Sequence, residues 1–440
     1  MNSNEQKLTW LAGFSHFITH GYMSLLPAVL VMITAEHSMS FTDIGIIANI
    51  GYFLYGLGAI PAGYLSDKFG SKRVLTFGVG GMALSSLLVG VSQGIWGFAV
   101  CYAFLGAFAS IHHPAGLSLI ARRVESAKGK ALGIHGVLGN VGIFLTPLVA
   151  VLGIKFFHTW RAAYVLYGLV GILFAVMMYL SRVDDEPDLH WRSFFRWGGA
   201  LRDPVDDEVA VPGSATGQAA PAKGGADLPG AMLILPVSLL LLYCGSILSG
   251  FIFRGSLTFM PSLLQQEVHF ITSSDEPVVL AGTVTTVVLS LGLIGAWFGG
   301  WINDKIKRPE FFPIILFAIV APLLYMVSSM TDNGLLSSIS LFSLFYYAWQ
   351  PSHNYLISRY TKKASHGMGF GVNFFLIFGV GSIATAIGGY VADDFGVDRF
   401  YLVMAVIAVA ALAAAIGVYL VKPYLIKGSL HLVRENNNAR

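Results

Sequence analysis

Twelve long apolar stretches constrain this chain more than any other feature. A membrane-spanning helix needs about 20 apolar residues, and runs of that order alternate here with short polar intervals. They lie at 9–34, 42–65, 74–92, 95–121, 131–154, 161–181, 231–263, 278–302, 311–331, 334–358, 367–391 and 399–421. Only 12% of the residues are charged, half of the roughly 25% usual in soluble domains. We therefore expect an all-α membrane protein with twelve transmembrane helices.

Positive charge is distributed unevenly along this pattern. Most of the 27 Lys and Arg residues lie in the N-terminus, in the loops after the even-numbered spans and in the C-terminal tail. Because loops rich in Lys and Arg stay on the cytoplasmic side, we expect both termini to be cytoplasmic. The sequence thus predicts a multi-pass protein of the bacterial cytoplasmic (inner) membrane or a derived membrane. A net charge of +3 placed in this way predicts no nucleic-acid partner.

The two halves of the chain repeat each other. Residues 63–68 (GYLSDK) correspond to 300–305 (GWINDK), and 114–122 correspond to 351–359 at the same spacing. Such duplication predicts two pseudo-symmetric six-helix lobes. The expected parts are an N-terminal lobe (1–181), a cytoplasmic linker (182–230), a C-terminal lobe (231–421) and a cytoplasmic tail (422–440). Interleaved aromatic and Arg residues favour a short interfacial helix within the linker.

The loop after the second span carries a recognisable motif. It reads Gly63-Tyr-Leu-Ser-Asp67-Lys68-Phe-Gly70-Ser-Lys72-Arg73, which resembles the G-x-x-x-D-[RK]-x-G-[RK]-[RK] signature of the major facilitator superfamily. A degenerate copy follows the eighth span. The resemblance implies a two-lobe secondary transporter that works by rocker-switch alternating access. It also implies a cytoplasmic gate formed by Gly63, Asp67, Lys68, Gly70, Arg73, Asp304, Lys305 and Arg308.

A narrower resemblance concerns the first, fourth and fifth spans. Ser15-His16-Phe17, His113-Pro114 and Gly139-Asn140 resemble motifs of the fosmidomycin-resistance branch of that superfamily. The chain departs from the branch where His20 replaces an aspartate and Ala115 replaces a glutamate. For this reason the drug-efflux activity of the branch is not carried over.

Ionisable side chains within the predicted spans are few and basic, and no acidic residue lies in the middle of a span. Ionisable groups at membrane depth usually face a cavity or mark a transport pathway. The resemblance implies that the first, fourth, seventh and tenth spans line such a cavity. We expect it to be formed by His16, His20, His113, Arg254, Gln350, His353, Asn354, Asn140 and Asn373.

The histidines have separate expected roles. His16 and His20 share one helix face because they are four residues apart. Neighbours lie about 100° apart on a helix, so only one of His112 and His113 should point inward, and we choose His113. His135 is expected to donate a hydrogen bond to a neighbouring helix. Since histidine titrates near pH 6.5, proton coupling is assigned to His16, His20 and His113.

Arg254 in the seventh span predicts the cargo. Its guanidinium stays charged, so at membrane depth it needs an anion, carbonyl groups or water, unless it snorkels to the outer interface. The leading hypothesis is a proton-coupled transporter, symporter or antiporter, of a small organic anion or drug-like solute, acting as a monomer without a cofactor.

Two alternatives remain open at this stage. The cavity histidines could carry a transition-metal ion such as iron or zinc, although carboxylate and thiolate ligands are missing, and no resident metal site is assigned. Alternatively, the chain could be a transporter-like membrane sensor or scaffold. An enzyme is not expected, since His16-Phe-Ile-Thr-His20 lacks the glutamate of a metalloprotease helix.

Overall fold

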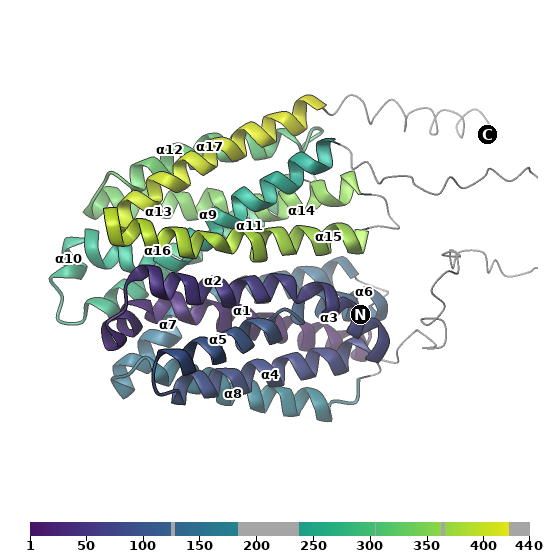
Figure 1. Cartoon of the computed structure of the whole chain (residues 1–440). Helices are drawn as coiled ribbons and strands as arrows, with labels where there is room; N and C mark the ends of the chain where they lie inside the picture. The colour runs from purple at the N-terminus through teal and green to yellow at the C-terminus, as the bar shows by residue number, and fades with distance from the viewer. Residues whose placement is uncertain (125–127, 184–236, 304, 362–365, 422–440) are drawn as a thin grey trace, which may run out of the picture.

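The computed structural model describes residues 1–124, 128–183, 237–303, 305–361 and 366–421 (Figure 1). Within these ranges the regular structure is entirely helical. The first lobe contains α1 (Ser3–His37), α2 (Phe41–Leu57), α3 (Ala59–Phe69), α4 (Ser71–Val91), α5 (Ile95–Ala109), α6 (His112–Arg123), α7 (Lys128–Phe157) and α8 (Arg161–Leu180). The predicted interfacial helix and the C-terminal tail lie outside the described residues.

The second lobe follows the same plan after the linker. It contains α9 (Val237–Glu267), the short α10 (His269–Thr272), α11 (Pro277–Asn303), α12 (Phe311–Val327), α13 (Asp332–Tyr346), α14 (Trp349–Tyr360), α15 (His366–Phe374), η3 (Phe375–Gly379), η4 (Val380–Ser382), α16 (Ile383–Phe395) and α17 (Val397–Val421). The fold therefore confirms the predicted all-α membrane architecture.

Among the described residues, ten helical segments are long and apolar enough to cross a membrane. The other two predicted spans are α12, which is a shorter apolar helix, and the interrupted pair α13 and α14. In Figure 1 the helices of each lobe run side by side, with α1–α8 below and α9–α17 above. The start of α1 and the end of α17 lie at one end, called here the terminal end. The turns at 38–40 and 158–160 lie at the other, called here the distal end.

Several predicted spans are interrupted near their middle. Three interruptions begin three or four residues before a proline: Gly58 before Pro61, Ser110 before Pro114, and Tyr347 before Pro351. The proline ring collides with the carbonyl group four residues earlier and removes a helical hydrogen bond. The eleventh span instead contains the π-turn η3, a feature that often occurs at functional sites. Regular α-helix is thus interrupted within these spans, by turns in three of them and by a π-helical turn in the eleventh.

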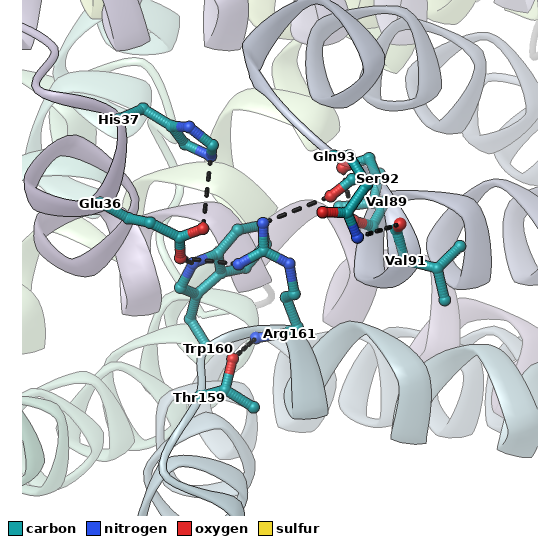
Figure 2. Close-up of polar contacts among 9 residues, drawn as sticks. All are labelled: Glu36, His37, Val89, Val91, Ser92, Gln93, Thr159, Trp160 and Arg161. Atoms are coloured by element: carbon teal, nitrogen blue, oxygen red, sulfur yellow. Dashed lines mark hydrogen bonds and ion pairs between the residues drawn. The ribbon is translucent and has the colours of Figure 1, made fainter.

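The distal end of the first lobe is tied together by Arg161 (Figure 2). Its Nη1 lies 2.6 Å from a carboxylate oxygen of Glu36, and its Nη2 donates to the Ser92 carbonyl at 3.3 Å. The indole of Trp160 donates to the same Glu36 oxygen at 2.6 Å. The end of α1, the turn after α4 and the start of α8 are thereby held in one arrangement.

The two lobes interlock through their distal halves. A Cβ atom added at Gly45 of α2 would lie 2.3 Å from the Thr385 carbonyl oxygen of α16. One added at Gly389 would lie 2.1 Å from the Phe41 carbonyl oxygen. Nearer the terminal end, a Cβ atom at Gly136 of α7 meets nothing within 4 Å. Close inter-lobe backbone contact is thus built into the distal half by glycine.

Candidate functional site

Five histidines of the first lobe gather into one buried group, called here the histidine cluster. α1 supplies His16 and His20, α6 supplies His112 and His113, and α7 supplies His135. The His16 ring is central, with centroid distances of 4.5 Å to His20, 4.7 Å to His112, 5.1 Å to His113 and 4.1 Å to His135. The sequence-based expectation that His16, His20 and His113 lie together agrees with this geometry.

His113 and His112 point in different directions: the His113 ring stacks on Phe374 and Phe378 of the second lobe, the direction chosen for it from the sequence, whereas His112 lies inside the first lobe between Ser15 and His135. The ring of His112 stacks on His16 with an interplanar angle of 17°, while His113 meets His16 edge-on at 81°. Both residues lie in the first turn of α6, directly after the break at Ser110. Because α1 passes this turn, two neighbouring side chains reach the same imidazole from different sides.

Three of the imidazoles are oriented by oxygen atoms around the cluster. His16 donates from Nδ1 to the His135 carbonyl at 2.8 Å. The Nδ1 of His112 lies 2.9 Å from the Ser15 hydroxyl, and the Nε2 of His113 lies 2.7 Å from the Tyr55 hydroxyl. A carbonyl oxygen can only accept, so the proton of neutral His16 is on Nδ1. Its Nε2 is therefore an acceptor, and it is buried without a hydrogen-bond partner.

His135 does more than join two helices. Its backbone carbonyl accepts a hydrogen bond from His16, which is not the donation expected of its side chain. Its ring also stacks on His16 at 20°, and its Nε2 lies 3.2 Å from the Nε2 of His112. The expectation of simple helix contact was therefore incomplete, because the side chain belongs to the cluster.

Gly139 of α7 makes room for the central imidazole. A Cβ atom at this position would lie 2.3 Å from both Cε1 and Nδ1 of His16. The Gly139-Asn140 motif recognised in the sequence thus has a direct steric role beside the cluster. The side chain of Asn140 is half-buried and makes no hydrogen bond within the described part of the chain.

Arg254 of α9 is 2% exposed and lies between the lobes. Its guanidinium carbon is 3.8 Å from the Tyr52 ring centroid and 5.9 Å from that of Tyr55, both on α2. Phe253 and Phe378 of the second lobe lie 5.3 and 5.7 Å away. Aromatic faces attract the cation, and its burial excludes the alternative that it snorkels to the interface.

No carboxylate or hydrogen-bond acceptor of the described residues contacts Arg254, and its Nε is buried without a partner. A buried unpaired charge is costly unless a counter-charge or hydrogen bonds compensate it. Cation–π contacts contribute only about 2 kcal/mol when desolvated. The site is therefore suited to an anion that supplies the missing acceptors.

Two aromatic side chains connect Arg254 with the histidine cluster. Tyr55 hydrogen-bonds His113 and lies beside the guanidinium. Phe378 stacks on His113 at 5.5 Å with an interplanar angle of 3° and also approaches His20 at 6.4 Å. The cationic side chain and the imidazoles thus share one aromatic wall at the lobe interface.

The predicted residues of the second lobe form a separate polar group. The Nε2 of His353 lies 2.8 Å from the Ser246 hydroxyl and 3.1 Å from the side-chain amide oxygen of Asn373. Asn373 donates to Asn354 at 3.3 Å. Gln350 lines a small pocket with Phe253, Tyr347 and Phe378, of which the two phenylalanines also approach Arg254. The structure therefore divides the expected cavity residues into two groups, with Arg254 between them.

The predicted gate residues lie at the terminal end. Gly70 adopts a positive φ of 88° between α3 and α4, which explains the glycine. Lys68 lies 5.1 Å from the Phe69 ring, Arg73 is exposed, and a Cβ at Gly63 would approach only Pro114, at 3.7 Å.

The second copy of the motif differs from the first. Lys305 is exposed, and Arg308 donates to the Tyr419 hydroxyl at 3.0 Å, within its own lobe. The side chains of Asp67 and Asp304 lie outside what the structure describes. The gate role of the whole set stays a prediction.

Sequence reasoning missed Asp393 of α16, which binds the start of α2 across the lobes. Its partners are more than three hundred residues away in the chain, so no local pattern indicates them. His112 and His135 did carry a signal in the sequence, because both are ionisable residues within predicted membrane spans.

Comparison with known proteins identifies the family to which this architecture belongs. The sequence profile described as Major Facilitator Superfamily matches residues 10–385. The "Membrane sensor protein UhpC" of Escherichia coli is 23% identical over 430 residues, covering 94% of this chain and 90% of the relative. The "D-galactonate transporter" of Escherichia coli is 23% identical, covering 83% of this chain and 84% of the relative.

Two further similarities agree with that match. The "Fosmidomycin resistance protein" of Escherichia coli is 25% identical, covering 89% of this chain and 87% of the relative. The crystal structure of a bacterial homolog to the human lysosomal transporter Spinster superposes with a TM-score of 0.74 at 13% identity, covering 95% of this chain and 97% of that one. The chain is thus a member of the Major Facilitator Superfamily and a membrane transporter by fold, not an enzyme.

Proposed function

We propose that this protein is a proton-coupled secondary transporter of a small organic anion. The observation that carries the proposal is Arg254, a buried guanidinium at the lobe interface without an acidic or hydrogen-bonding partner among the described residues. A carboxylate or phosphonate matches the planar donor fork of such a group. The D-galactonate transporter among the relatives is named for a cargo of this chemistry.

Proton coupling is assigned to His16, His20 and His113. A proton on His20 or His113 adds positive charge on the aromatic wall that both share with Arg254. Bound anion and bound proton then stabilise each other, and this coupling is reciprocal. Ligands that strengthen each other's binding travel together, so the arrangement favours symport.

Alternating access follows from the distribution of inter-lobe contacts. The distal halves interlock at Gly45 and Gly389, whereas the termini and the basic loops belong to the opposite, cytoplasmic end. We infer that the distal side is closed in this state and that Arg254, which is buried here, becomes accessible when the lobes rock. Rocking of one lobe against the other would break the distal contacts and expose Arg254 to the outside, within a single monomer.

Uptake by reconstituted proteoliposomes tests the cargo. The probes are radiolabelled D-galactonate, a simple dicarboxylate and a phosphonate, each with an imposed inward proton gradient. We expect at least one anion to accumulate, Arg254→Gln to abolish uptake, and Arg254→Lys to retain a minor part. Arg399→Gln is the matched control, because Arg399 is exposed and lies beside Asp398 at the distal end. Undiminished anion uptake by Arg254→Gln would refute the proposal.

The proton role has its own test. His20→Ala should abolish pH-driven accumulation while anion counterflow continues, because exchange needs no net proton movement. Survival of pH-driven flux in the triple His16→Ala, His20→Ala, His113→Ala variant would show that these residues are not the coupling site. Saturable anion binding without counterflow in the wild type would identify a sensor, as the relative UhpC is named.

A further inference from the structure

We propose that His16, His112 and His113 form a binding site for a divalent first-row transition-metal ion. One ligand atom from each residue can be chosen such that all three lie within 4.8 Å of one another, and all three residues are buried. The site is confined to the first lobe, on α1 and α6. The site needs neither Arg254 nor the second lobe, but it shares His16 and His113 with the residues assigned to proton coupling.

The outer contacts of the three imidazoles match those of metal-binding histidines. A ligating histidine usually holds its other ring nitrogen in a hydrogen bond to a nearby oxygen, which sets the tautomer and the ring orientation. Here those oxygens are the His135 carbonyl for His16, the Ser15 hydroxyl for His112 and the Tyr55 hydroxyl for His113. His16 and His113 thus keep their second ring nitrogens for the interior of the cluster, and the Nε2 of His112 also lies there, 3.2 Å from the Nε2 of His135.

The unused acceptor on His16 is the strongest individual observation. With Nδ1 donating to a carbonyl oxygen, Nε2 has a lone pair, and this atom is buried and unpartnered. A buried acceptor without a donor is uncommon and calls for an explanation. A metal ion bound at Nε2 supplies one, since a lone pair on neutral imidazole is what such an ion requires.

The donor set indicates the class of ion. Imidazole nitrogen suits Zn²⁺, Cu²⁺, Ni²⁺ and Fe²⁺, whereas Mg²⁺ and Ca²⁺ prefer oxygen. Bond lengths of about 2.0–2.1 Å to zinc place tetrahedral ligand nitrogens roughly 3.4 Å apart. The rings therefore draw together on binding by small side-chain rotations. Three neutral ligands leave the fourth position open for water or an anion.

Titration with Co²⁺ tests the site directly, because tetrahedral Co²⁺ has a visible absorption spectrum. The full-length protein is purified in detergent with a tag that contains no histidine. We expect saturable binding of one ion per chain with a tetrahedral spectrum, displaced by Zn²⁺. His16→Ala and His112→Ala should each weaken binding by roughly 100-fold or more. His353→Ala is the matched control, a buried histidine of the other lobe, and should bind as the wild type does.

A milder variant separates loss of the site from misfolding. Ser15→Ala keeps all three ligands and removes only the hydroxyl beside His112, so affinity should fall by roughly 10-fold. Binding should also weaken as the pH falls, because protons compete for the same nitrogens. Absence of a one-to-one site in the wild type, or unchanged affinity in both His16→Ala and His112→Ala, would overturn the proposal. Anion uptake by chelator-treated protein tests the transport function separately.

Discussion

Asp393 of the second lobe hydrogen-bonds Thr42 in the first turn of α2, in the first lobe. Its carboxylate accepts from the backbone N–H of Thr42 at 2.7 Å, from the Thr42 hydroxyl at 2.5 Å and from the Phe41 N–H at 2.8 Å. The first N–H groups of a helix have no partner within it and favour negative charge nearby. The distal seal between the lobes therefore includes hydrogen bonds made across the interface to a helix N-terminus, and outward opening must break them.

Asp393→Ala is expected to shift the protein towards a distally open state. Losing these hydrogen bonds in an exposed setting should change the free-energy difference between the distally closed and open states by about 1 kcal/mol. This corresponds to a roughly five-fold change in the ratio of their populations. Distances between spin labels at Ala35 and Asp275, on the distal rims of the two lobes, should lengthen. Asp394→Asn changes the next residue and should leave the distribution as in the wild type. An unchanged distribution in Asp393→Ala would show that these hydrogen bonds do not hold the seal.

Gly389→Ala should prevent the distal seal from closing. The added methyl group would lie 2.1 Å from the Phe41 carbonyl oxygen, and backbone cannot yield as a side chain can. We expect the same spin labels to report a persistently open distal end, and anion counterflow to fall severely. Gly371→Ala, in the same span, meets nothing within 4 Å and serves as the control. Normal closure in Gly389→Ala would contradict the contact seen here.

Gly139→Ala should damage the histidine cluster without touching a histidine. The methyl group would occupy space now filled by His16, at 2.3 Å from its Nδ1, so the ring must leave the His135 carbonyl. We expect both Co²⁺ affinity and pH-driven uptake to fall at least 10-fold. Gly136→Ala, one turn earlier and in open space, should behave as the wild type does. If the two variants behave alike, Gly139 does not hold the histidine cluster in place.

Glu36→Gln should lower stability modestly. The amide keeps an oxygen for the Trp160 indole but loses the charge that faces Arg161 at 2.6 Å. Partly exposed ion pairs contribute up to about 1 kcal/mol and are screened by salt. The melting temperature in detergent should therefore fall by a few degrees at low salt, and the difference should shrink at high salt. Asp275→Asn, on an exposed distal turn, is the control.

Much of the architecture could be predicted because it depends on composition and on short repeats. The apolar runs predicted helices of membrane-spanning length, and the copy of residues 63–68 at 300–305 predicted two lobes. Pro114 lies four residues after a helix break, a local steric effect that is visible in the sequence. Pro27 and Pro147 lie within unbroken helices, so proline alone does not predict where a break occurs.

The candidate site was only partly predictable. Helical spacing brought His16 and His20 together, but it did not indicate that His112 contacts His16, because angular position on one helix ignores where a second helix passes. The sequence identified Arg254 as a cation at membrane depth that needs an anion, carbonyl groups or water unless it snorkels to the interface. Its aromatic cradle of Tyr52 and Tyr55 comes from α2 of the other lobe, and no spacing in the chain links these residues.

Hydropathy and duplication by themselves determined that this protein crosses a membrane as two related lobes, since lipid permits few backbone arrangements and repeated segments fold alike. Tertiary structure alone decided that α6 and α7 bring three further imidazoles against the two of α1, and that Asp393 closes the distal end on Thr42. The physical reason is that such contacts depend on the distances between helices. These distances are set by close helix contacts at glycine residues and by side-chain packing, and they leave no periodic pattern in the sequence.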